Sequence, residues 1–243
     1  MERLDKIISA TGKKSRREVK LLVKQGRILV DGIPAASADM KVDPETMEIV
    51  LDGENLGYEK FTYIMLHKPA GVLSAVEDSR QKTVLDLLPE ELQKRDLSPV
   101  GRLDKDTEGL LLLTNDGALT HRLLSPKSHV DKVYYARVEG RLEESDIAAF
   151  REGVALKDFT CLPAGLEILS ENECLVTLHE GKFHQVKRML ASRGKPVVYL
   201  KRLSMGPLQL DEELSAGHWR HLTEEERNSL FQGAKQASMD RTP

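Results

Sequence analysis

Long apolar runs are absent from the sequence: nowhere do about 18 apolar residues follow one another. Because a helix needs roughly 20 such residues to cross a bilayer, we expect no membrane span. Charged residues follow Met1 directly, at Glu2, Arg3 and Asp5, where a secretory signal peptide would carry an apolar core. These absences predict a cytoplasmic protein.

Cysteine is scarce, with Cys161 and Cys174 the only two. Their spacing fits no metal site, and no motif surrounds them, so we expect both thiols to be reduced. The seven histidines are scattered along the chain, without the grouping that a zinc site needs. The sequence therefore predicts no metal centre.

Net charge is low, at −3, but the charges are unevenly distributed. Residues 42–59 contain no basic side chain. Residues 13–27 contain a single acid, Glu18, against seven basic residues: Lys13, Lys14, Arg16, Arg17, Lys20, Lys24 and Arg27. A basic segment of this kind favours contact with a phosphate backbone.

Ser15 and Glu18 form a Ser-x-x-Glu capping box, which predicts that a helix begins there and ends near Gly26. At 100° per residue, Val19, Leu22 and Val23 fall on one side of this helix. Four basic residues share one quadrant away from them: Arg16, Arg17, Lys20 and Lys24. Such a stripe can be a solvated surface or an RNA-binding surface, and the near absence of acid favours RNA.

A short strand and an Asp-Gly turn are predicted over residues 27–32. In order, Arg3-Leu4-Asp5-Lys6, Ser15-Arg16-Arg17-Glu18 and this segment resemble the S4 RNA-binding domain. The resemblance implies that the basic helix binds structured RNA. Residues 51–59 are polar and contain glycine, so we expect a linker there. The predicted domains are residues 1–59 and 60–243.

The second domain is expected to begin with a strand over residues 61–66, which Pro69 ends because proline cannot continue a ladder. The segment after it is either a plain turn or a loop that contacts RNA through Lys68. A single helix is predicted over residues 84–94.

A charged loop, residues 101–109, lies between two glycines and precedes Leu110–Leu113. This pattern predicts a polar loop held on a buried strand, whose glycines leave room for an RNA backbone. An ion-paired turn is one alternative. A calcium loop is another, but Leu112 and Asn115 stand where it needs oxygen ligands.

The third alternative is catalytic. Residues 101–114, Gly-Arg-Leu-Asp-Lys-Asp-Thr-Glu-Gly-Leu-Leu-Leu-Leu-Thr, resemble the signature of the RsuA/RluB class of pseudouridine synthases. Further parts of the chain resemble this class in the same order: residues 115–117, 121–126, 132–134 and 180–189, then Arg202, Gly206 and residues 217–223. The resemblance implies an α+β protein, in which a small S4-like domain precedes a catalytic domain with a mixed, largely antiparallel sheet flanked by helices.

Pseudouridine formation moves uracil from N1 to C5 on the same ribose, so the reaction consumes no electrons and we expect no cofactor. The resemblance assigns the chemistry to the carboxylate of Asp104. It acts as a nucleophile on C1′ or as a base at C2′, and both routes stay open. A nearby cation keeps such a carboxylate charged. By resemblance that cation comes from Lys187, with Arg188 as second choice, because neighbours on a helix point about 100° apart.

A strand is predicted over residues 132–138, on which Tyr134 and Tyr135 face opposite sides. The resemblance places Tyr134 against the uracil, so we expect Tyr135 to lie in the core. The target base must leave its stack, and we expect Arg102 to help to fill the gap. Arg188 is expected at the RNA backbone, whereas Asp106 and Glu108 fix the loop.

The resemblance implies a ribosomal RNA substrate: 16S RNA in a partly assembled small subunit, at uridine 516. A large-subunit 23S target is the alternative within the class. A non-catalytic S4-type RNA-binding protein is the alternative outside it, and loss of Asp104 would indicate that protein. We expect a monomer.

Overall fold

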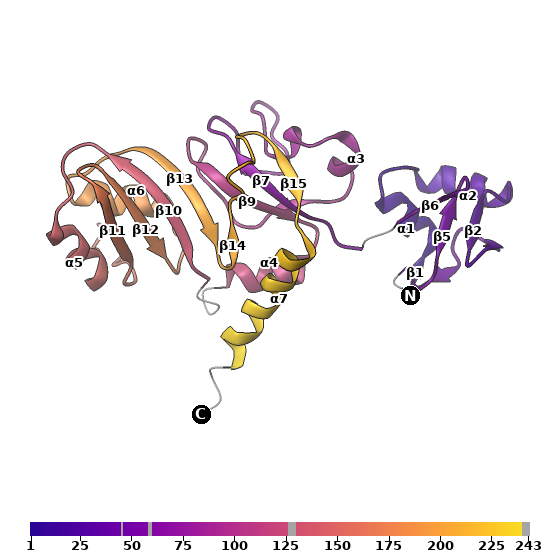
Figure 1. Cartoon of the computed structure of the whole chain (residues 1–243). Helices are drawn as coiled ribbons and strands as arrows, with labels where there is room; N and C mark the ends of the chain where they lie inside the picture. The colour runs from indigo at the N-terminus through magenta and orange to yellow at the C-terminus, as the bar shows by residue number, and fades with distance from the viewer. Residues whose placement is uncertain (45, 58–59, 126–129, 240–243) are drawn as a thin grey trace. The chain divides into compact units, whose positions relative to one another are not determined.

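The computed structural model describes residues 1–44, 46–57, 60–125 and 130–239 (Figure 1). Its contacts divide the chain into two compact units, residues 1–62 with 88–98, and residues 63–87 with the chain from residue 99 onward. Tyr58 and Glu59, at the end of the expected linker, lie outside the described residues, and the domain boundary at 59/60 stays a prediction. Among the described helices, none is long and apolar enough to cross a membrane.

The first unit combines short helices with a small antiparallel sheet. Its helices are α1 (Leu4–Ala10), α2 (Arg16–Lys24) and α3 (Glu90–Gln93). The sheet has the order β3 (Ile33–Pro34), β2 (Ile28–Val30), β5 (Ile49–Leu51) and β6 (Glu54–Asn55), and β1 (Glu2–Arg3) pairs separately with β4 (Lys41–Val42). Buried residues such as Leu4, Ile8 and Val19 form the core between helices and sheet.

The predicted basic helix is confirmed as α2, and its capping box is present. The backbone N–H of Glu18 donates to Ser15 Oγ at 3.3 Å, and the Ser15 N–H donates to Glu18 Oε2 at 2.7 Å. Val19 and Leu22 are buried. The four basic side chains of the stripe are exposed, so the predicted orientation of the helix is correct.

The linker predicted from residue 51 is wrong in its first half. Strands β5 and β6 pair there as a hairpin, and Leu56 is buried in the core. The turn is formed by Asp52 and Gly53, with φ of 56° and 86°. Both central residues of a type I′ turn need positive φ, and Asp-Gly supplies it. The same signal at Asp31 and Gly32 predicted the first hairpin correctly, at φ of 50° and 75°.

The second unit is built on a mixed, largely antiparallel sheet, as expected. Its main order is β11 (Gly165–Ser170), β12 (Glu173–Leu178), β10 (Lys132–Val138), β13 (Val197–Met205), β9 (Glu108–Thr114), β7 (Tyr63–Lys68) and β15 (Trp219–His221). Strand β14 (Leu208–Gln209) pairs with β13, and β8 (Ser98–Pro99) pairs with β9. The β13–β9 pair is parallel, and the other pairs along the main order are antiparallel.

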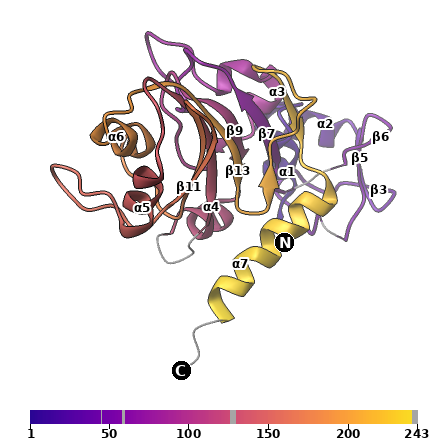
Figure 2. The same ribbon diagram turned by 60° about the vertical axis from the view of Figure 1, so that its left-hand side comes forward.

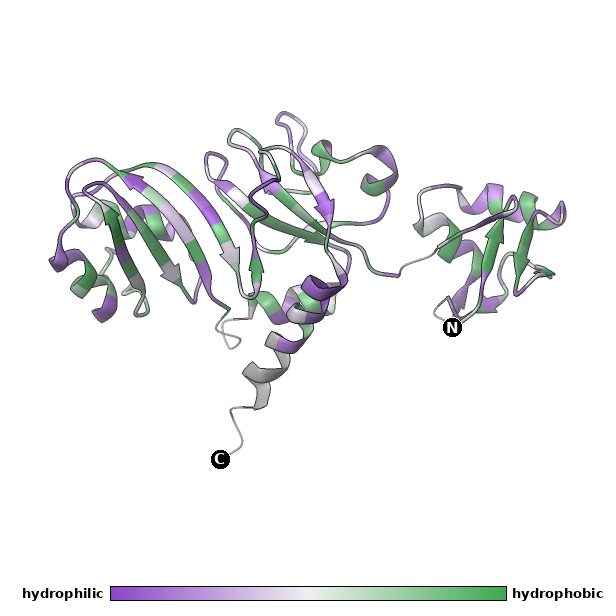
Figure 3. Cartoon of the chain, viewed as in Figure 1, coloured by the Kyte–Doolittle hydropathy of each residue, from purple (hydrophilic) through white to green (hydrophobic). Residues whose placement is uncertain are grey.

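Helices flank both halves of this sheet (Figures 1 and 2). They are α4 (Gly117–Leu124), α5 (Glu144–Glu152), α6 (Gln185–Ser192) and α7 (Glu224–Met239), with a 3-10 turn, η1, at Leu85–Leu87. Helix α5 contacts β11, α6 contacts β13, and α4 contacts α7. Figure 3 shows the apolar stretch of β7 and β9 at the centre, where Leu110 to Leu113 are at most 1% exposed.

Gly109 lies where β9 meets β13. Its φ is 108°, and a Cβ at this position would collide with the backbone oxygen of Arg202. Only glycine accommodates both the positive φ and this close approach. The expectation that this glycine leaves room for RNA is therefore wrong, because the space belongs to β13.

The single helix predicted over residues 84–94 is also wrong. Two short pieces, η1 and α3, replace it because Pro89 stands between them as the N-cap of α3, with ψ of 156°. Proline lacks the N–H that an interior helical position donates, and it pushes the preceding residue out of the helical region.

Candidate active site

The charged loop before β9 meets the beginning of α6 at one carboxylate. The Nζ of Lys187 lies 3.0 Å from Oδ2 of Asp104, whose side chain is 24% exposed. The same ammonium lies 2.5 Å from Oδ1 of Asp106. His184 approaches from the other side, with Nε2 at 3.4 Å from Oδ1 of Asp104. The loop and the helix thus place two nitrogen groups on Asp104.

These two residues lie at the start of α6. His184 precedes the helix in the left-handed conformation, at φ 50° and ψ 32°, and Lys187 lies in its first turn. Burial lowers the pKa of Lys187, but hydrogen bonds to Asp106 and Asp104 outweigh it, so that the pKa lies above its usual value. Lys187 therefore stays charged beside the carboxylate.

Arg188 points to different partners. It forms an ion pair with Asp158, and its guanidinium lies 5.2 Å from the centre of the Phe159 ring. The structure thus brings Lys187, the preferred candidate, to Asp104 and directs Arg188 to the segment before β11. The role of Arg188 at the RNA backbone stays a prediction.

The burial of Lys68 argues against the predicted contact with RNA. Its side chain is fully buried at the end of β7. Its ammonium donates to the backbone oxygens of Pro69, Lys105 and Thr107 at 3.0, 3.2 and 2.8 Å. Burial lowers the pKa of Lys68 to about 8, although Asp106, Asp104 and Glu108 oppose this shift. Lys68 therefore anchors the loop that carries Asp104.

We expect Lys68→Met to lower kcat about 10- to 100-fold, because the loop carbonyls lose their common donor and a shift of about 1 Å at a reacting group costs rates of that order. With a pKa of about 8, loss of the Lys68 proton should also lower the wild-type rate as the pH rises above that value. This alkaline decrease should be absent in Lys68→Met. Lys105→Met is the matched control, because Lys105 is exposed on the same loop.

The stability of the folded protein should change with pH in the direction opposite to that of the rate. The pKa of Lys68 in the folded protein is below the value of about 10.4 in an unfolded chain. Between about pH 8 and 10 the unfolded state therefore binds more protons, and this group makes folding more favourable as the pH rises. A wild-type rate that follows the melting temperature across this interval would contradict the anchoring role.

Tyr134 faces the site. Together with Arg102, Asp104 and His184 it lines a small cavity of about 70 Å³. Its side chain is 8% exposed. Tyr135 points to the other face of β10 and is only half-buried, with its ring 6.0 Å from that of Tyr199. The expectation of a core position for Tyr135 is therefore wrong.

Arg102 is exposed at the rim of the same cavity. Asp106 pairs with Lys187, and Glu108 accepts a hydrogen bond from the Tyr199 hydroxyl at 2.7 Å. Both acids thus fix the loop and its surroundings.

Sequence reasoning missed Ser74. Its hydroxyl donates to the backbone oxygen of Leu103 at 2.8 Å and accepts from the Leu103 N–H at 3.1 Å. This buried pair holds the residue next to Asp104. The contact joins positions 29 residues apart, and no local motif signals it.

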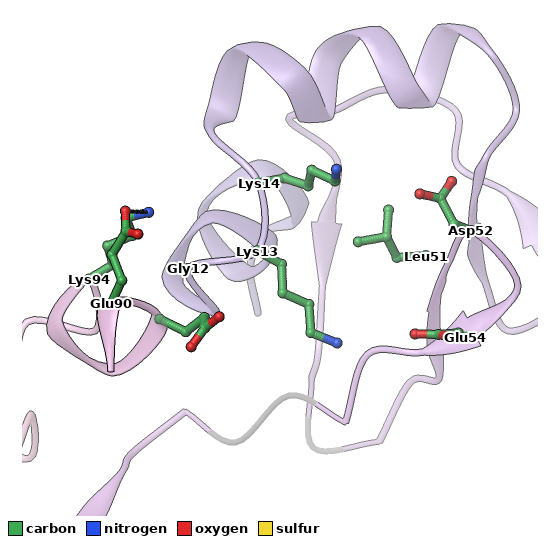
Figure 4. Close-up of a pocket in the computed structure, with 9 residues that line it drawn as sticks. Gly12, Lys13, Lys14, Leu51, Asp52, Glu54, Glu90 and Lys94 are labelled. Atoms are coloured by element: carbon green, nitrogen blue, oxygen red, sulfur yellow. Dashed lines mark ion pairs between the residues drawn. The ribbon is translucent and has the colours of Figure 1, made fainter. Parts of the chain in front are cut away.

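A larger groove, of about 400 Å³, lies in the first unit and has no catalytic constellation (Figure 4). Lys13 and Lys14 face Asp52 and Glu54 across it, and Glu90 pairs with Lys94. These opposite charges offset one another. Within the described residues, no group of three or more potential metal ligands occurs.

Comparison with known proteins gives the family of the chain. A model of RNA pseudouridylate synthases matches residues 62–192, and a model of the S4 domain matches residues 2–48. The chain is 49% identical over 233 residues to the RNA pseudouridine synthase YtzG of Bacillus subtilis, covering 94% of this chain and 98% of the relative. It is 41% identical over 232 residues to ribosomal small subunit pseudouridine synthase A of Vibrio cholerae, covering 94% and 99%.

A crystal structure of a pseudouridylate synthase covers 95% of this chain and 100% of its own, with a TM-score of 0.68 and 36% identity. The expected class, with an S4 domain ahead of a catalytic domain, is thereby confirmed. The chain therefore belongs to the RNA pseudouridylate synthases, in the RsuA-like group with an N-terminal S4 domain, and is an isomerase that forms pseudouridine in RNA.

Proposed function

We propose that this enzyme converts one uridine of 16S ribosomal RNA to pseudouridine, with uridine 516 as the expected site. The observation that carries the proposal is similarity along nearly the whole chain to ribosomal small subunit pseudouridine synthases A, at 41% identity in both Vibrio cholerae and Pseudomonas aeruginosa. A 23S target is the alternative within the class. A non-catalytic RNA-binding role would require the loss of Asp104, which is present.

The geometry supports the chemistry as follows. The ammonium of Lys187 lies 3.0 Å from Asp104 at the small cavity. The flipped uridine enters between this carboxylate and Tyr134, and Asp104 attacks C1′ or removes a proton at C2′. The C1′–N1 bond breaks, uracil turns, and C1′ joins C5. The C5 proton is lost and N1 gains one, so the product is an isomer of the substrate.

The basic stripe of α2 would bind the RNA around this uridine. Its four side chains are exposed, and each contact with a phosphate releases counterions. We extend the proposal to a monomeric enzyme that acts in the cytoplasm on a partly assembled small subunit.

Pseudouridine mapping of total ribosomal RNA tests the target. A strain that lacks the enzyme should lose one pseudouridine in 16S RNA, and the wild-type protein should restore it. Loss of a 23S pseudouridine instead would replace the proposed substrate by its alternative, and an unchanged map would refute a ribosomal target.

The salt dependence of RNA binding tests the basic stripe. Replacing Arg16, Arg17, Lys20 and Lys24 by Ala should weaken binding and reduce the slope of log K against log salt by up to about 3.6, since each lost phosphate contact contributes about 0.7 to 0.9. Lys6→Ala with Lys41→Ala serves as the control, because both lysines are exposed in the same unit outside the stripe. A slope equal to that of the wild type would remove α2 from the RNA interface.

A further inference from the structure

Phe183 is a large apolar side chain that the proposed reaction does not use. It is 75% exposed, one of the most exposed large apolar residues in the described part of the chain. Single apolar residues on a surface are common and need no function. The position of Phe183, however, distinguishes it from such residues.

The ring of Phe183 stacks on the ring of His184, with centroids 3.8 Å apart and an interplanar angle of 17°. His184 in turn lies 3.4 Å from Asp104 and lines the cavity. The left-handed backbone at His184 directs its ring to the carboxylate. Phe183 is therefore held at the rim of the active site by a residue that touches the reacting group, while most of its surface remains open.

The surroundings of this ring suit RNA. Lys182 and Arg102, which are both exposed, line the same cavity. Lys187 lies one turn along α6 from His184. A flat aromatic face among cations offers stacking to a base and attraction to its phosphates, as in proteins that bind unpaired nucleotides.

We propose that Phe183, supported by His184, stacks on an unpaired nucleobase next to the flipped uridine. The inference rests on the enzyme's action on RNA and adds a subsite for a flanking nucleotide. Arg102 is still expected to help to fill the gap that the flipped base leaves, and Tyr134 is still expected to lie against the uracil. One flanking base then covers the open face of Phe183, which determines how the RNA strand enters the site.

Substitutions that change only the aromatic face test this subsite. The probe is a fragment of the ribosomal RNA that the wild-type enzyme modifies in the mapping experiment. Phe183→Leu should weaken binding about 10-fold, within the range of one base–aromatic stack, and Phe183→Trp should restore it. Leu169→Ala is the matched control, because Leu169 is 48% exposed in the same unit and is expected to leave binding unchanged. Melting temperatures should match the wild type, because an exposed ring contributes little to folding.

A double-mutant cycle identifies the partner base. The same RNA is prepared with an abasic nucleotide on the 5′ or the 3′ side of the target uridine. At one of these positions, loss of the base should weaken wild-type binding, and Phe183→Leu should then cost nothing further. Additive effects at both positions, or wild-type binding by Phe183→Leu, would overturn the proposal. Failure of the wild-type enzyme to modify ribosomal RNA would instead refute the proposed function.

Discussion

Asp104→Asn should lower the rate of pseudouridine formation by at least about 10⁴-fold, the scale seen when a catalytic nucleophile is removed. The amide keeps the size and planar shape of the carboxylate. It can neither attack C1′ as an anion nor accept the C2′ proton. Lys187 keeps Asp106 as a partner at 2.5 Å, so the loop should hold its position. RNA binding should therefore stay within about two-fold of the wild type.

Asp106→Asn is the matched control for this experiment. Asp106 pairs with the same ammonium, but its side chain is 74% exposed, against 24% for Asp104. Its loss should lower kcat less than about 10-fold. Single-turnover rates with saturating enzyme separate chemistry from binding. Turnover by Asp104→Asn comparable to that by Asp106→Asn would assign the reaction to another group.

Local patterns in the sequence predicted the elements whose causes are local. The capping box at Ser15 gave the start of α2, and the strand predicted over residues 132–138 is β10. The buried leucines of β9 follow directly from their apolar run. Asp-Gly signals a turn at both hairpins. After Leu51, however, the polar composition also fits a linker, so composition alone does not reveal the second hairpin.

Long-range contacts explain the rest. Lys68 is basic and precedes a proline, which suggested an exposed loop. In the fold, all six residues of β7 are buried, and the ammonium finds its acceptors on a segment about 40 positions away. Only the assembled loop supplies three carbonyls to offset the cost of burying the charge. The requirement for glycine at position 109 also comes from a long-range contact, because the atom that excludes a side chain belongs to Arg202 on another strand.

The choice between Lys187 and Arg188 depends on both local helix geometry and long-range contacts. Helical geometry states that only one of two neighbours can face Asp104. It cannot state which one without the position of α6 on the sheet. The structure decides this through contacts from α6 to both sides, because Arg188 pairs with Asp158 while Lys187 reaches the loop.

Lys187→Met should lower kcat about 10²- to 10³-fold at neutral pH and change KM little. The substitution leaves Asp104 and Asp106 close together without the cation that lies between them. Two carboxylates without a cation repel each other, and Asp104 also loses the donor that lies 3.0 Å from it. A displacement of about 1 Å at a reacting group costs rates of this order.

A double substitution makes this prediction specific. Adding Asp106→Asn to Lys187→Met removes the repelling neighbour and should recover part of the lost rate. Loss of the Lys187 proton should not lower the wild-type rate between about pH 5 and 8, because the pKa of Lys187 lies above its usual value. Arg188→Met, which leaves the Asp104 pair intact, should keep the wild-type rate. If the double variant were no faster than Lys187→Met alone, Lys187 would act by position alone, and electrostatic control of Asp104 would be excluded.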